Sequence, residues 1–390
     1  MSHRSIMALA LVVTGALAAT TVSTPAAFAE EETQAPNVAE AAQGSQASLN
    51  EAQSEGGPQS GATDQAGDPT PITAPEGADD TPVTIIVALE DGNVGIPWYH
   101  RVFGLSSQTK HETVRDRIET SVEQTVPGAD VTDVADYTHA FDGFAISAPA
   151  SCLEAIKNTA GVKTAFVERH HKPLVVDGES AAASVDAVNP ALKNGSSLEM
   201  TRANQTTVKG DKQVIEVIDT GIEATHPAFS GSMDGVPVRL TQRDIESLVG
   251  KLSHGASGAY LNSKIPFVFD YADNDADVLP TSTKDLSHGT HVAAIAAANA
   301  PDLQGTAPNA QIIVAKVAAD KDGSIPDSTV LAALDDAVII KPDSINLSLG
   351  DDAGMGTEAG TVYAEVYKNL AAAGVTVNAA AGNSYSSAYS

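Results

Sequence analysis

The chain has 390 residues and a formal net charge of −28, because 50 aspartates and glutamates outnumber 22 lysines and arginines. This acidity disfavours binding to nucleic acids and to anionic lipid surfaces, whose phosphate groups repel it. Hydrophobic residues make up 42% of the chain, which is enough to build a core. The single cysteine, Cys152, excludes an intrachain disulfide framework and a cluster of thiolate metal ligands.

Two N-terminal segments are expected to stay outside the folded core. Residues 1–29 have the pattern of a signal peptide, in which Arg4 precedes an apolar run over residues 6–19 and a small-residue cleavage site follows. The apolar run is too short to span a bilayer comfortably, which argues against a membrane anchor. Residues 30–82 contain no aromatic residue, Lys or Arg, a composition typical of a disordered acidic spacer.

Residues 83–176 alternate strand and helix patterns in a way that indicates a small α+β domain. Strands are expected at residues 83–89, 131–139, 144–148 and 162–167, and helices at 106–126 and after Pro149. Asp142-Gly143 between the second and third strands predicts a hairpin. The resulting β-α-β-β-α-β order is the split βαβ, or ferredoxin-like, pattern.

After a polar connection over residues 177–210, residues 211–390 alternate apolar strands with helices. The expected strands cover residues 214–218, 266–269, 312–317, 344–349 and 375–380, and the expected helices cover 290–299, 328–340 and 358–373. Gly374 is placed to end the last helix in a left-handed conformation. Uniformly apolar strands between helices predict an α/β fold with a parallel sheet that is covered on both faces.

Asp219 follows the first of these strands, where parallel sheets place active-site groups. The triplet Asp219-Thr220-Gly221 also marks aspartic proteases, but those enzymes need two carboxylates that share a proton. The chain contains no second Asp-Thr-Gly or Asp-Ser-Gly, so it cannot supply that pair by itself.

His288 and His291 lie three positions apart at the start of an expected helix. Zinc proteases of the H-E-x-x-H type need a spacing of four and an intervening glutamate. Gly289 and Thr290 stand between the two histidines, so the spacing argues against zinc.

Two further segments come directly at the ends of expected strands. The side-chain amide of Asn383 can donate to a developing oxyanion. The strand end Ser348-Leu349-Gly350 can pair with an extended peptide as an added strand. Taken alone, the first is also an ordinary turn residue and the second an ordinary buried strand.

Together these motifs resemble the subtilisin-like serine proteases. The matching segments are VIDTGIEATHPAF (217–229), SHGTHVAAIAAA (287–298), GTAPNAQIIVAKV (305–317), SINLSLG (344–350) and VTVNAAAGN (375–383). They occur in the order of the family, with Asp before His, from about residue 200 to the end. The resemblance implies that Asp219 orients His288, the general base and then acid, and that Asn383 is the oxyanion donor. It also implies that Ser348, Leu349 and Gly350 line the substrate cleft.

Two other segments extend the resemblance. YTHAFDGFAISAP (137–149), followed by GVKTAFVE (161–168), resembles the inhibitory propeptide of the family. Such a propeptide acts as an intramolecular chaperone and blocks the cleft until it is cut off, here within residues 170–200. KIPFVFDYADNDADV (264–278) resembles the larger cell-envelope proteinases, the lactocepin-like branch. The implied partners are polypeptide substrates, and the implied location is extracellular, secreted or cell-wall associated.

The chain departs from the family at the nucleophile. The family presents its serine as Gly-Thr-Ser-Met-Ala, and no Gly-Thr pair of this chain continues in that way. We therefore expect the N-terminal part of a secreted serine endopeptidase precursor, without peptidase activity on its own. The alternative is a non-catalytic pseudoprotease or a propeptide-type inhibitor.

Remaining polar residues are expected to be structural. No organic cofactor is implied, and a structural calcium ion stays open without an assigned site. The aspartates at residues 270, 273, 275 and 277 fail the EF-hand pattern and are expected in a solvated loop. His254 is expected in a surface loop, and His170-His171 in an exposed processing segment. Cys152 is expected to be a small core residue.

Overall fold

The computed structural model describes residues 80–90, 106–173, 202–280, 287–350 and 355–382. The expected signal peptide, almost all of the acidic spacer, most of the polar connection and Asn383 lie outside these ranges. Within them, no helix combines the length and the apolar character that a membrane span requires.

The N-terminal domain has the ferredoxin-like topology that the sequence predicts. Its elements are β1 (Pro82–Leu89), α2 (Ser106–Thr125), β2 (Thr132–Tyr137), β3 (Gly143–Pro149), α3 (Leu153–Lys157) and β4 (Val162–Val167). The strands form one antiparallel sheet in the order β2-β3-β1-β4. The helical stripe of Val114, Ile118 and Val122 packs on the face of the sheet that carries Ile85 and Val87, and Cys152 lies buried in this core.

The second domain is built on five parallel strands in the order β14-β12-β6-β10-β7. The strands are β6 (Val214–Asp219), β7 (Phe267–Asp270), β10 (Gln311–Lys316), β12 (Ser344–Leu347) and β14 (Thr376–Ala379). The helices are α6 (Gln242–Leu248), α7 (His288–Ala297), α8 (Asp327–Ile340) and α9 (Thr357–Ala372). Because all five strands are parallel, their carboxyl ends meet at one edge, which is where the sequence places Asp219.

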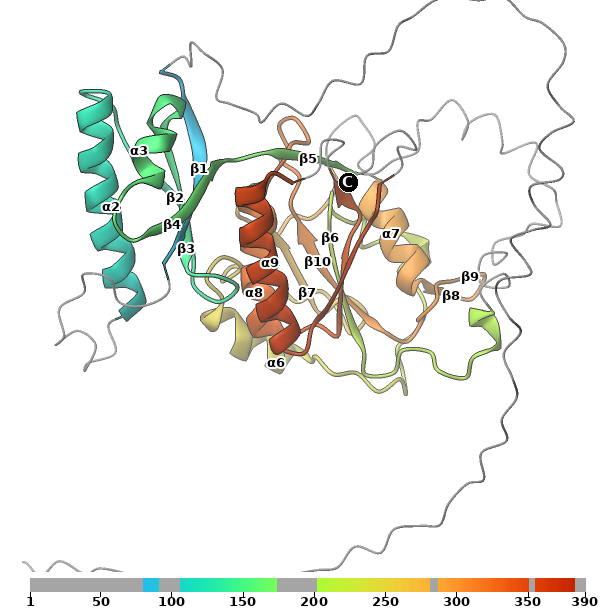
Figure 1. Ribbon diagram of the computed structural model, residues 1–390. Helices are drawn as coiled ribbons and strands as arrows, with labels where there is room; N and C mark the ends of the chain where they lie inside the picture. Colours follow the sequence, from blue (N-terminus) through green and yellow to red (C-terminus); the bar gives the residue numbers. More distant parts are fainter. Residues whose placement is uncertain (1–79, 91–105, 174–201, 281–286, 351–354, 383–390) are drawn as a thin grey trace, which may run out of the picture. The chain divides into compact units, whose positions relative to one another are not determined.

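Helices cover both faces of this sheet, as the apolar strands predict (Figure 1). On one face, Ile218 and Ile313 belong to a core that includes Leu331 and Leu334 of α8. On the other, Val217 and its neighbours pack with the small residues of α7. Gly374 ends α9 with φ +87°, the left-handed conformation that its position in the sequence predicts.

The described residues also contain five very short strands, of which only the one at residues 349–350 overlaps a strand expected from the sequence. β8 (Asn299–Ala300) and β9 (Leu303–Gln304) form a small antiparallel ladder. β5 (His170–Pro173) continues from the N-terminal domain and lies between β11 (Ile325–Pro326) and β13 (Leu349–Gly350). It pairs antiparallel with both, so a stretch of the N-terminal part of the chain completes a three-stranded sheet on the second domain.

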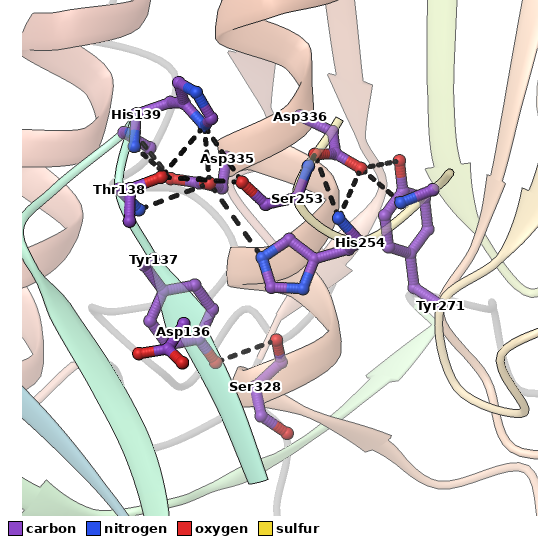
Figure 2. Close-up of polar contacts among 12 residues, drawn as sticks. Asp136, Tyr137, Thr138, His139, Ser253, His254, Tyr271, Ser328, Asp335 and Asp336 are labelled. Carbon is purple, nitrogen blue, oxygen red and sulfur yellow. Dashed lines mark hydrogen bonds and ion pairs between the residues drawn. The ribbon is translucent and has the colours of Figure 1, made fainter. Parts of the chain in front are cut away.

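The β2–β3 hairpin of the N-terminal domain packs against α8 (Figure 2). The Asp335 carboxylate, which is fully buried, accepts hydrogen bonds from the backbone N–H groups of His139 (2.8 Å) and Ala140 (2.7 Å). The Tyr137 hydroxyl donates to the Ser328 carbonyl oxygen at 3.1 Å. The hairpin is therefore held by the N-terminal and middle turns of one helix of the second domain.

Candidate active site

Asp219 and His288 meet at the carboxyl edge of the parallel sheet. Asp219 is the last residue of β6, and His288 is the first residue of α7. His288 Nδ1 lies 2.8 Å from Asp219 Oδ1 and 3.0 Å from Oδ2. The Asp219 side chain is 1% exposed and that of His288 is 10% exposed. Because Nδ1 is committed to the carboxylate, proton exchange with a third group falls to Nε2.

The glycine that follows His288 allows α7 to approach the end of β6. A Cβ atom on Gly289 would lie 2.3 Å from the Gly221 carbonyl oxygen and 3.1 Å from Asp219 Oδ1. The Gly289 N–H also donates to Thr220 Oγ1 at 3.1 Å, which ties the start of the helix to the loop after the strand. The residue types in Asp-Thr-Gly and His-Gly-Thr are therefore those that bring the carboxylate and the imidazole together.

The three residues expected to line a substrate cleft, Ser348, Leu349 and Gly350, follow β12 at the same edge of the sheet. Leu349 and Gly350 form β13 and pair with β5, while the other side of β5 pairs with β11. The Ser348 hydroxyl accepts a hydrogen bond from Asn346 Nδ2 at 2.9 Å. The arrangement encloses one extended segment of the chain between two short strands.

Asn383, the expected oxyanion donor, lies outside the described residues. The strand before it, β14, ends at the same edge as Asp219, because both belong to one parallel sheet. Its role therefore stays a prediction from the resemblance.

Asp327 is a buried acidic residue beside this cleft that the sequence analysis did not single out. It is the first residue of α8, directly after β11, and its side chain is fully buried. Its carboxylate binds Arg169 and His171 from the segment that contains β5. An acidic residue in the first turn of a helix was a visible signal. Nothing in the sequence, however, paired it with residues more than 150 positions away.

Two histidines that the sequence places at the surface, His171 and His254, are largely buried in the structure. His171 is buried rather than exposed, because β11 and β13 flank it and its Nε2 lies 2.7 Å from Asp327 Oδ1. His254 is in a loop, but its side chain is only 14% exposed because the ring packs on Tyr137, with 5.6 Å between ring centroids. Both residues lie where the N-terminal domain covers the second domain.

The expected solvated acidic loop is only partly solvated. Asp270 is fully buried, and its carboxylate accepts a hydrogen bond from Lys316 Nζ at 2.6 Å. Lys316 Nζ also contacts the carboxylate of Asp320, and Asp273 Oδ2 accepts from the Asp320 N–H. Although these three carboxylates lie close enough to share a cation, the lysine ammonium already supplies the positive charge. The Lys316 ammonium thus offsets part of the negative charge of this cluster.

Comparison with known proteins identifies the second domain. The sequence profile described as the subtilase family matches residues 210–390. A PI-type proteinase of Lactococcus lactis subsp. cremoris is 34% identical over 256 residues, which cover 64% of this chain and 12% of the proteinase. A thermophilic serine proteinase of Bacillus sp. (strain AK1) is 36% identical over 182 residues, or 45% of this chain and 34% of that protein. A C5a peptidase of Streptococcus pyogenes is 29% identical over 153 residues, or 37% of this chain and 12% of that peptidase.

These matches define both the family and the extent of the similarity. The chain spans about an eighth of the length of the lactococcal proteinases that it matches. Because 64% of the chain exceeds the span of residues 210–390, the similarity to them also reaches into residues before 210. The expected resemblance to the lactocepin-like proteinases is confirmed. Residues 210–390 form a domain of the subtilase family of serine peptidases.

Proposed function

We propose that this chain carries the Asp and His members of a serine endopeptidase that cuts polypeptides. The observation that carries the proposal is the 2.8 Å contact between His288 Nδ1 and Asp219 Oδ1 at the carboxyl edge of the sheet. His288 Nε2 takes the proton of a serine hydroxyl as its oxygen attacks the peptide carbonyl carbon, and then gives that proton to the leaving amine. Asp219 fixes the ring tautomer and stabilises the imidazolium.

The remaining parts of the mechanism come from the family. Asn383 is the proposed donor to the oxyanion, and Ser348, Leu349 and Gly350 are the proposed edge on which substrate pairs. The chemistry uses no organic cofactor. A serine in the Gly-Thr-Ser-Met-Ala setting is absent from the 390 residues, so we propose that they do not hydrolyse peptides alone.

The N-terminal domain is proposed to be an inhibitory propeptide. In support, β5 occupies the space between β11 and β13 as an extended antiparallel strand, which is the pose expected of a polypeptide substrate. While β5 is bound there, a substrate cannot pair with β13. The signal-like residues 1–29 favour export, and the subtilase relatives favour an extracellular or cell-wall location for the active protein.

A second candidate is a non-catalytic pseudoprotease or propeptide-type inhibitor. The pairing of β5 with β11 and β13 favours it, because a platform that only binds peptides needs these strands and no nucleophile. The two candidates differ in whether an added serine segment creates activity that depends on Asp219 and His288.

The test joins the 390-residue chain to the downstream part of the aligned PI-type proteinase, so that a serine segment is supplied. We expect hydrolysis of a fluorogenic polypeptide, and we expect Asp219→Asn to lower kcat by about 10⁴-fold. Asp302→Asn, at an exposed position, is the matched control and should leave the rate unchanged. Hydrolysis that survives both Asp219→Asn and His288→Ala would overturn the proposal.

A second measurement covers the case in which the fusion does not fold. Proton NMR of the 390-residue chain should show a strongly deshielded Nδ1 proton on His288, which disappears in Asp219→Asn. Peptide hydrolysis by the unfused chain that requires Asp219 would contradict its proposed inactivity.

A further inference from the structure

Asp327 lies directly beside the extended segment in the cleft. The carboxylate accepts hydrogen bonds from His171 Nε2 at 2.7 Å and from Arg169 at 3.0 Å (Nη2) and 3.2 Å (Nε). The Arg169 backbone N–H donates to the same carboxylate at 2.9 Å. Two basic side chains, two positions apart on one extended segment, thus converge on a single acidic group.

The environment of Asp327 keeps this group charged. Burial by itself would raise the pKa of the carboxyl, but the hydrogen bonds and positive charges of His171 and Arg169 lower it to about 2. A buried carboxylate that loses its cationic partners stays desolvated and unpaired, which is strongly unfavourable.

Removing the segment would leave Asp327 poorly satisfied. Among the described residues outside the segment, Tyr363 donates a hydroxyl hydrogen bond to Asp327 Oδ1 at 2.7 Å. One neutral donor does not replace a guanidinium and an imidazole. An emptied cleft therefore presents a buried negative charge to whichever polypeptide enters next.

The cleft also has room for a basic side chain other than histidine. A cavity of ≈ 60 Å³ borders His171 and Arg169, and its other walls include Val330, Leu349 and Tyr367. These apolar walls suit the methylene stem of a basic side chain longer than that of His171.

We propose that Asp327 makes the cleft selective for extended polypeptides that place a basic side chain at the position of His171 or, two residues earlier, of Arg169. The proposal rests on the proposed role of the cleft as a peptide-binding site. It identifies residues 169–171 as a segment that holds the cleft by charge as well as by strand pairing.

The first experiment uses the bound segment of the full 390-residue chain as its own ligand. Hydrogen–deuterium exchange over residues 170–173, 325–326 and 349–350 reports whether β5 is docked. We expect the double variant Arg169→Gln/His171→Gln to speed exchange there at least about tenfold, since buried ion pairs are costly to break. Lys172→Gln removes a charge from the same segment at an exposed residue and is the matched control.

A rescue variant tests whether the charge or the shape of the side chains at residues 169 and 171 holds the segment in the cleft. Restoring one cation, as in Arg169→Gln/His171→Arg, should restore most of the protection. When Asp327 is replaced by Asn, the native segment and the segment with Arg169→Gln/His171→Gln should show hydrogen-exchange rates within about threefold of each other. Tyr363→Phe is the control for this substitution, because it removes a hydrogen bond to Asp327 but keeps the carboxylate and should keep the preference.

The second experiment adds a peptide to the variant with the weakened segment. Fluorescence anisotropy compares VERHHKP, the sequence of residues 167–173, with VEQHQKP on the Arg169→Gln/His171→Gln chain. We expect the basic peptide to bind at least about tenfold more tightly. Equal binding of the two peptides would overturn the selectivity and leave the proposed function standing. Failure of both to bind would instead remove the peptide-binding cleft on which the proposal rests.

Discussion

Glu216 shows how a single residue opposes the stability of this domain. It lies in the middle of β6, fully buried, and neither carboxylate oxygen has a hydrogen-bond partner among the described residues. Burial, and to a smaller extent the negative charge of Asp336, raises its pKa to about 8. The side chain is therefore neutral in the folded protein at pH 7, although it would ionise in the unfolded chain.

The pH dependence of this effect follows from the sign of the shift. Below the ordinary pKa of 4.5, Glu216 is protonated in both states and has no effect that depends on pH. As pH rises from there to about 8, the unfolded chain releases the proton and the folded chain retains it, so stability falls. We predict that Glu216→Gln raises the free energy of unfolding by on the order of a few kcal/mol at pH 8, and by much less at pH 5.

Urea denaturation of the full chain at both pH values measures this difference. Glu223→Gln, which changes the same charge outside the core, is the control and should give the same small change at both. A gain that does not grow with pH would show that Glu216 is already ionised in the folded protein.

At the scale of elements, the approach of α7 to β6 depends on a glycine. A Cβ atom at residue 289 would lie 2.3 Å from the Gly221 carbonyl oxygen, so Gly289→Ala must displace the helix or the loop. We predict a loss of at least about 2 kcal/mol in stability and loss of the deshielded His288 proton. Gly374→Ala is the contrasting variant, because a Cβ there meets nothing within 4 Å and only the positive φ is unfavourable.

Comparison of Gly289→Ala with Gly374→Ala distinguishes a steric collision from backbone strain. Gly374→Ala should lower the free energy of unfolding by about 1 kcal/mol, with the His288 proton signal intact. Equal losses in the two variants, both with an intact signal, would mean that α7 tolerates a side chain at residue 289. Thermal melts and proton NMR of the same samples provide both readouts.

In the second domain, the elements that could be predicted from the sequence are apolar strand segments and helices of ten residues or more. The five parallel strands and the helices at residues 288–297, 327–340 and 357–372 appear close to their expected bounds. β5 is a polar segment and β11 has only two residues, so neither shows a strand pattern of its own, and they pair only because the two domains meet.

The same distinction applies to the site. Asp219 and His288 could be placed together because one ends a parallel strand and the other opens a helix in a recognisable motif. Asp327 could not, because its partners Arg169 and His171 belong to another domain. The helix dipole alone already explains an acidic residue at the start of α8. Nothing in the local sequence therefore indicated that Asp327 binds a distant segment.

At the scale of the whole molecule, and apart from the segment that contains β5, two kinds of contact between the N-terminal domain and the subtilase domain can be compared. Asp335 is fully buried and accepts backbone hydrogen bonds from His139 and Ala140 (Figure 2). Glu365 forms an ion pair with Lys163 at 2.6 Å, with side chains that are 28% and 33% exposed. Of the two, we expect the buried hydrogen bonds of Asp335 to contribute more to the free energy of docking, since exposed ion pairs contribute little to stability.

We therefore predict that Asp335→Asn weakens docking of the hairpin by on the order of 2–4 kcal/mol. The amide loses the negative charge and places an NH₂ group where Oδ2 faces His139 Nδ1 at 3.1 Å and the Thr138 N–H at 3.4 Å. Glu365→Gln should cost about 0.5 kcal/mol or less. Hydrogen exchange at residues 138–140 measures docking, and exchange in β1 monitors the integrity of the N-terminal domain. Faster exchange at the hairpin with unchanged exchange in β1 is the expected result for Asp335→Asn. Similar effects of the two substitutions would instead place the docking free energy in the exposed ion pairs.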